Sequence, residues 1–180
     1  MKYLFFVLLI FYCISCQNPT ESESNYFLPI ESLSRVEDNI KAIYEDAKLL
    51  SVSSNHVNLD GKSQIWSYKY FSPSLNKNIY IHSSINTVNI DSLSLNIMQN
   101  GHEVNGSIIE SSLVIDKANE NGLKKFIKKY PNYSLELTLY QPINWNRPVW
   151  YLLSVSNDAI NNSGAIAVFG DTGELVPINE

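Results

Sequence analysis

The sequence predicts an α+β fold made of two tandem repeats, each of which combines a helix with an antiparallel β-sheet. A stretch with apolar residues at helical spacing is followed by strands with alternating apolar residues, and this order occurs twice. In each repeat a tryptophan, Trp66 or Trp150, opens an aromatic strand. With 44% hydrophobic and 17% charged residues, the chain of 180 residues can bury a core of this kind.

Residues 1–15 are expected to form a signal peptide. Lys2 is followed by an unbroken apolar run that is short for a bilayer span and typical of a secretory signal. The run ends in Ile14-Ser15-Cys16, which resembles a bacterial lipoprotein signal with Cys16 as the lipidated first residue. Cys13 stands where that motif usually has Leu, and an ordinary signal peptide or a signal anchor are the alternatives.

A flexible tether is predicted over residues 16–31, because Gln17–Asn25 is polar and acidic and shows no apolar periodicity. Removal of residues 1–15 takes away Lys2 alone among the charged residues, so the net charge moves from −5 to about −6. This acidic balance gives no electrostatic basis for nucleic-acid binding. If Cys16 is lipidated, no thiol is left for a disulfide or a cysteine nucleophile.

The first repeat, residues 32–105, is expected to begin with a helix over residues 34–50. Ser34 and Glu37 have the spacing of a capping box. One apolar face is formed at steps of three and four by Val36, Ile40, Ile43, Ala47 and Leu50. Period-two alternation then predicts strands over residues 64–71, 78–83, 87–90 and 93–97, before an Asn100-Gly101 turn.

The second repeat, residues 106–180, repeats this order. An apolar run predicts a strand over 108–115, and Asp116 is expected to cap a helix that Pro131 ends. The apolar side of this helix is predicted to hold Ala118, Leu123, Phe126, Ile127 and Tyr130. Alternation predicts further strands over 135–139, 149–155 and 165–169.

The end of the second repeat resembles the PepSY-like domain family. Arg147–Leu152 resembles its Trp-bearing strand, and Ala165–Glu174 resembles its strand that runs into an Asp-x-Thr-Gly-Glu turn. The first half, with Trp66-Ser67-Tyr68, resembles a degenerate copy, and two copies resemble the tandem arrangement of the secreted β-lactamase inhibitor proteins. Asn121-Gly122 departs from the family pattern by weakening the second helix. The resemblance implies that the chain binds a protein or peptide, for example a protease or another envelope enzyme.

No motif for catalysis, a metal or a cofactor is found. His56, His82 and His102 are scattered without metal-ligand spacing, and no nucleophile elbow surrounds any serine. Asp171-Thr172-Gly173 has no second copy, whereas an aspartic protease needs two apposed aspartates. We therefore expect a protein that is not an enzyme and holds no cofactor.

Two groups of residues are candidates for partner binding. The first is the loop 141–148, where two prolines flank Trp145 and Arg147, two residue types common in interface hot spots. The second is the strand stripe Trp66, Tyr68 and Tyr70, which forms either a ligand platform or packing against the first helix. Four lysines within residues 124–129 are expected to solvate a helix end, with contact to anionic lipid or a nucleic-acid backbone as the alternative.

These observations predict an extracytoplasmic lipoprotein, anchored in the bilayer through acylated Cys16, that binds a protein or peptide. A surface protein that binds a glycan or small ligand with the same aromatic residues is the alternative, and a structural envelope component is a third. Gln17 in place of Asp after Cys16 favours the outer membrane if the host is Gram-negative.

Overall fold

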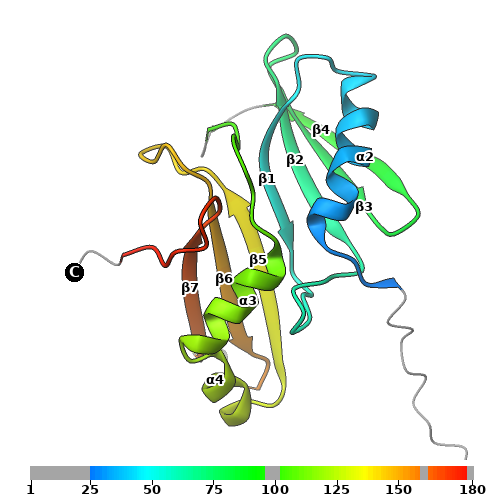
Figure 1. The fold of residues 1–180 in the computed structure, drawn as a ribbon. Coiled ribbons are helices and arrows are strands. Elements are labelled where there is room, and N and C mark those ends of the chain that lie inside the picture. Colours follow the sequence, from blue (N-terminus) through cyan, green and yellow to red (C-terminus); the bar gives the residue numbers. More distant parts are fainter. Residues whose placement is uncertain (1–24, 96–101, 159–161, 178–180) are drawn as a thin grey trace, which may run out of the picture.

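The computed structural model describes residues 25–95, 102–158 and 162–177. The first half contains helix α2 (Pro29–Lys41) and strands β1 (Lys48–Ser54), β2 (Trp66–Ser72), β3 (Lys77–Ser83) and β4 (Val88–Leu95). The second half contains helices α3 (Ser111–Glu120) and α4 (Leu123–Lys129) and strands β5 (Tyr133–Tyr140), β6 (Val149–Ser156) and β7 (Ser163–Phe169). The predicted α+β class, with helix and antiparallel sheet occurring twice, is confirmed (Figure 1).

The two halves share one antiparallel sheet, with strand order β4-β3-β2-β1-β5-β6-β7. The first strands of the two halves, β1 and β5, meet at its centre, where Ser53 lies opposite Thr138. Each half then extends outward in chain order. The two halves therefore pair as two similar units would across a two-fold axis, although both belong to one chain.

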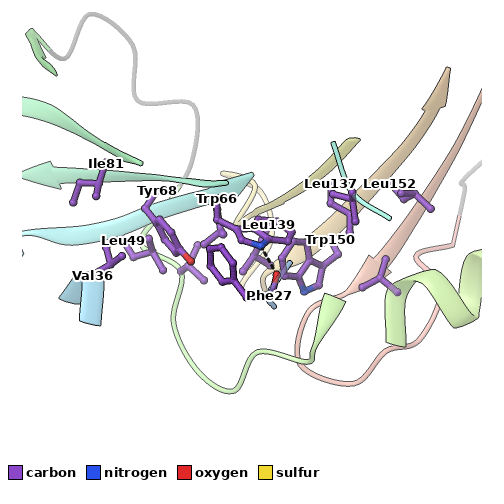
Figure 2. Close-up of a cluster of buried hydrophobic side chains, with 14 of the residues drawn as sticks. Phe27, Val36, Leu49, Trp66, Tyr68, Ile81, Leu137, Leu139, Trp150 and Leu152 are labelled. Carbon is purple, nitrogen blue, oxygen red and sulfur yellow. Dashed lines mark hydrogen bonds between the residues drawn. The ribbon is translucent and has the colours of Figure 1, made fainter. Parts of the chain in front are cut away.

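Two tryptophans hold the centre of the core together. Trp66 and Trp150 are fully buried, and their rings meet edge to face with centroids 6.4 Å apart. The indole N–H of Trp66 donates to the carbonyl of Phe27 at 2.9 Å (Figure 2). The indole N–H of Trp150 donates to the carbonyl of Ile109 at 3.2 Å. Each of the two carbonyls lies two residues before a helix. The same kind of tryptophan hydrogen bond therefore fixes the start of α2 and of α3 against the sheet.

The first helix differs from its prediction at both ends. It begins at Pro29, which suits the first helical turn, and Glu31 accepts the Leu28 N–H at 3.0 Å. It ends at Lys41, and only residues 48–50 of the predicted helix 34–50 belong to the central strand β1. Pairing of Lys48 and Leu49 with β2 outweighs the helical spacing of Leu50.

The last residues of the predicted tether 16–31 also belong to the fold. Phe27 is buried and exchanges two backbone hydrogen bonds with Ser63, at 3.0 and 3.1 Å. The predicted turn at Asn100-Gly101 and the rest of the tether lie outside the described residues.

The second helix was also predicted incorrectly. Residues 111–115 are helical rather than part of a strand, so Asp116 lies inside α3 and not at its cap. A short apolar run fits either structure, and here Val114, Ile115 and Ala118 face the sheet. The predicted helix 116–130 is broken at Gly122, which has a φ of 112°.

Most of the predicted core is confirmed. Ile40, Ala47, Trp66 and Trp150 are buried, and Phe126 is half-buried. Ile43 is 59% exposed, because the helix ends before it.

The two halves are also fitted together at Gly61, in the loop between β1 and β2. The Ser111 hydroxyl, at the start of α3, donates to the Gly61 carbonyl at 2.6 Å. A Cβ at Gly61 would lie 2.5 Å from the Ser112 nitrogen, so only glycine fits there. The first turn of the second-half helix therefore rests directly on a first-half loop.

Candidate functional site

The three described helices cover the same face of the sheet. Tyr68 contacts α2, and Trp150 contacts the segment before α3. Tyr68 lies opposite Val52, Val52 lies opposite Leu139, and Leu139 lies opposite Trp150. Because residues directly opposite one another point to the same side of a sheet, Tyr68 and Trp150 lie on one face. The opposite face, here called the open face, carries the alternate side chains. Most of them are half-buried or exposed, and these include Ser53, Ser67, Lys69, Tyr80, His82, Thr138, Tyr140, Tyr151 and Leu153.

The centre of the open face in the second half is aromatic. Tyr140 of β5 and Tyr151 of β6 stack with centroids 5.1 Å apart and an interplanar angle of 16°. Partial burial and the neighbouring Tyr151 raise the pKa of Tyr140 to about 12, so the Tyr140 phenol is neutral near pH 7. The pair therefore presents flat apolar surface with hydrogen-bonding hydroxyls. In the first half, Lys69 lies over the Tyr80 ring at 5.8 Å.

The loop 141–148 lies beside this pair and is fixed to the end of β7. Arg147 forms a bidentate pair with Asp171, with its Nη2 2.6 Å and its Nε 2.9 Å from carboxylate oxygens. Its guanidinium also lies 3.9 Å from the Phe169 ring centroid, and Trp145 contacts the same ring at 5.6 Å. Hydrogen bonding to Arg147 lowers the pKa of Asp171.

Trp145 and Arg147 are therefore half-buried and ordered by neighbours within the chain. The predicted binding role of this loop is untested, but its shape is preorganised. A partner that meets Trp145 would not have to order a flexible loop.

A hollow of about 370 Å³ lies where the two halves meet at one end of the sheet. Its polar walls include Lys48, which pairs with Glu103 at 3.1 Å, and Gln141, whose buried side-chain oxygen has no partner among the described residues. The hollow is lined by Lys48, Leu50, Phe71, His102, Glu103, Asn105, Gln141 and Asn146.

The aromatic stripe in β2 belongs to the core. Trp66, Tyr68 and Tyr70 are at most 1% exposed, so the structure gives them the packing role and not the platform role. The Tyr68 hydroxyl donates to the Pro29 carbonyl at 2.7 Å and meets the Ser32 hydroxyl at 2.6 Å, which fixes α2 on the sheet. Burial raises the pKa of both tyrosines.

The open-face residues were missed, although the same alternation indicates them. If Leu139 and Trp150 point inward, their neighbours Tyr140 and Tyr151 point outward. What alternation alone could not decide is which of the two faces the helices cover. Cys16, the proposed lipid attachment point, lies outside the described residues.

One open-face cluster combines a serine, a histidine and an aspartate. Ser67 Oγ lies 2.9 Å from His82 Nδ1, and His82 Nε2 lies 3.6 Å from Asp91. The second distance is too long for a hydrogen bond, and the side chains of His82 and Asp91 are 43% and 63% exposed. Ser67 and His82 lie within paired strands, whose backbone N–H groups serve the sheet and offer no oxyanion hole. This geometry suits polar contacts better than nucleophilic catalysis.

Among the described residues, no three His, Cys, Asp or Glu side chains are close enough to hold a metal ion. In the same part of the chain, no helix has the length and apolar character needed to cross a membrane.

The fold is shared with a solved structure. It is a candidate lipoprotein from Clostridium difficile 630, which matches with a TM-score of 0.52 and 13% sequence identity. The match covers 81% of this chain and 90% of that chain. At this identity the likeness shows the fold alone. No protein-family model matches the chain, and neither does any curated protein.

Proposed function

We propose that this chain is a lipid-anchored extracytoplasmic protein that binds a protein or peptide through the open face of its sheet. The observation that carries the binding role is the stacked pair Tyr140 and Tyr151 on a face that no described helix covers. Aromatic side chains on a rigid sheet supply large contact area at little entropic cost. A protease or another envelope enzyme is the partner class that the PepSY-like resemblance suggests.

The anchoring role is supported by two observations. The apolar run that ends in Ile14-Ser15-Cys16 has the form of a lipoprotein signal, and the solved structure that shares this fold is itself a candidate lipoprotein. Two acyl chains at Cys16 would anchor the protein stably, whereas one would be marginal. Gln17 favours the outer membrane of a Gram-negative host.

The PepSY-like relationship is part of the same proposal. It is supported by the sheet, in which helix and antiparallel strands occur twice around a central strand pair. It also fits the Trp-bearing second strand of each half.

The binding role is tested by cross-linking in envelopes of cells that produce the full chain. We compare wild type, a variant with Tyr140→Ser and Tyr151→Ser, and a control with Leu113→Ser. Leu113 is 49% exposed on α3, away from the open face. The cross-linked partner should disappear with the tyrosine variant and persist with the control, while both variants keep the wild-type melting temperature. A partner that cross-links equally to all three proteins would contradict the proposal.

A second candidate function, binding of a polar small ligand such as a sugar, is favoured by the hollow beside Gln141. Its 370 Å³ volume, its polar lining and the apolar wall at Phe71 suit such a ligand. Titration of the labelled protein with an oligosaccharide panel tests it by NMR. Shifts confined to the hollow, and lost in Gln141→Leu, would support this function over protein binding.

A further inference from the structure

The outer edge of the second half is incomplete when it is compared with the first half. In the first half, β4 pairs along the whole of β3, from Lys77 opposite Leu95 to Ser83 opposite Val88. In the second half β7 takes the place of β3, because Val168 pairs with Trp150 as Ser83 pairs with Trp66.

The described residues after β7 begin to fill its outer edge but cover only one end of it. Val168 bridges Leu175, and the Val176 N–H donates to the Ala167 carbonyl at 2.9 Å. The described residues end at Pro177. By the alternation of strand hydrogen bonds, the N–H and C=O of Ala165 point the same way as those of Ala167. No described residue pairs with the backbone of Ala165.

A cavity opens next to this unpaired stretch. It has a volume of about 140 Å³ and lies between α3, α4 and the ends of β6 and β7, with Ala118, Phe126, Leu152, Gly164 and Ile166 among its walls. A cavity of about 150 Å³ holds a benzene molecule, so this one can hold a branched apolar side chain.

Comparison with the first half explains the cavity. Four residues before Ser83 lies Ile79, which is fully buried, and four residues before Val168 lies Gly164. The second half therefore lacks the side chain that fills this position, and its described residues form no full strand that covers it. In the first half, the residue opposite Ile79 on the covering strand is Leu93.

Helix α4, beside the cavity, carries positive charge. Helix α4 contributes Leu123 and Phe126 to the cavity, and its four lysines at positions 124, 125, 128 and 129 are exposed. None of the four forms an ion pair with any described residue, although acidic residues outnumber basic ones in the chain. A segment that lies along β7 would run beside this cationic helix.

We propose that the β7 edge over residues 163–166 binds an extended peptide segment of a partner protein as an added strand. A Leu or Ile of that segment enters the cavity opposite Gly164, and acidic neighbours meet the α4 lysines. The first half supplies the template, because β4 shows which strand this edge accepts. Strand addition supplies backbone hydrogen bonds, and the cavity and lysines supply specificity. This site is separate from the open face and rests on the proposed function only in that the chain binds a protein.

The test is selection of linear peptides from a phage-displayed library on residues 17–180, which retain every described residue. NMR of the complex with one selected peptide should show slowed exchange of the Ala165 amide. The matched pair is Ala165→Pro, which removes an outward N–H at an edge position that tolerates proline, and Ala165→Thr, which keeps it. We expect roughly tenfold weaker binding for Ala165→Pro and little change for Ala165→Thr.

A second arm fills the cavity. Ala118→Leu places a larger apolar side chain in it and should weaken binding of the apolar anchor without lowering the melting temperature. The proposal is overturned if no selected peptide affects β7, if Ala165→Pro binds like wild type, or if peptides bind only after residues 178–180 are deleted. It is also overturned if the edge serves a second copy of the chain, seen as a dimer that Ala165→Pro dissociates. Peptide binding that persists in the Tyr140 and Tyr151 variant separates this site from the open face.

Discussion

Replacement of Gly61 by alanine tests how the two halves fit together. Gly61 has a φ of 75°, and a Cβ there would lie 2.5 Å from the Ser112 nitrogen and 2.6 Å from the Ser111 carbonyl carbon. The left-handed backbone costs a residue other than glycine about 1–2 kcal/mol. The clash involves backbone atoms, which cannot rotate away, and overpacking of this kind adds about 1–3 kcal/mol. We therefore expect Gly61→Ala to lower the free energy of unfolding by about 2–5 kcal/mol.

Gly106→Ala is the matched control. Gly106 also has a positive φ, 91°, but a Cβ there would meet nothing within 4 Å. Gly106→Ala therefore costs only the free energy of placing alanine in a left-handed backbone conformation. It should be less destabilising than Gly61→Ala by about 1–3 kcal/mol. That difference corresponds to roughly 2–12 °C in melting temperature for a chain of this length.

Urea unfolding followed by tryptophan fluorescence measures both variants. Trp66 and Trp150 are buried at the centre of the core and report its loss. If Gly61→Ala and Gly106→Ala unfold at the same urea concentration, the loop at Gly61 is not packed against α3, and the described junction between the halves is incorrect.

Three further predictions concern single positions. Ile43→Asp should change the free energy of unfolding by less than about 0.5 kcal/mol because Ile43 is 59% exposed, whereas Ile40→Asp should cost several kcal/mol in the same urea titration. Arg147 lowers the pKa of Asp171, so the pair stabilises the fold at pH values above the ordinary carboxyl pKa of 3.8. This stabilisation is lost as the pH falls through the lower pKa that Asp171 has in the folded protein. The difference in urea midpoint between wild type and Asp171→Asn should therefore shrink over that acidic range. Mass spectrometry of the mature protein should find acylated Cys16 at its N-terminus, and cleavage at any other residue would contradict the lipoprotein signal.

The strands could be predicted from sequence because their signal is local. Trp66, Tyr68 and Tyr70 alternate with other residues, and such alternation has one structural explanation when turn residues flank it. The helix boundaries could not be predicted in the same way. Residues 48–50 fit a helical face, and only the presence of β2 beside them makes them a strand.

The candidate site was less accessible to sequence analysis than the fold. Large aromatic residues draw attention to β2, yet size favours burial as much as binding. Deciding between these roles requires knowing which face α2 covers, and that depends on contacts between residues far apart in sequence, such as Tyr68 with Pro29. The part of β7 that no described residue pairs with is even harder to predict, because it is defined by the absence of a strand from the described residues of the second half.

Comparison of the two halves separates what the fold requires from what it does not. Trp66 and Trp150 occupy matching places, and the indole N–H of each donates to a carbonyl two residues before a helix. This hydrogen bond is therefore part of the fold in both halves. The next residue along each strand points to the open face and differs, since Ser67 follows Trp66 and Tyr151 follows Trp150. A serine at this place is compatible with the fold in the first half, so the aromatic side chain of Tyr151 is not needed to hold the sheet. The partner contact proposed above for Tyr151 is therefore compatible with what the fold requires at this place.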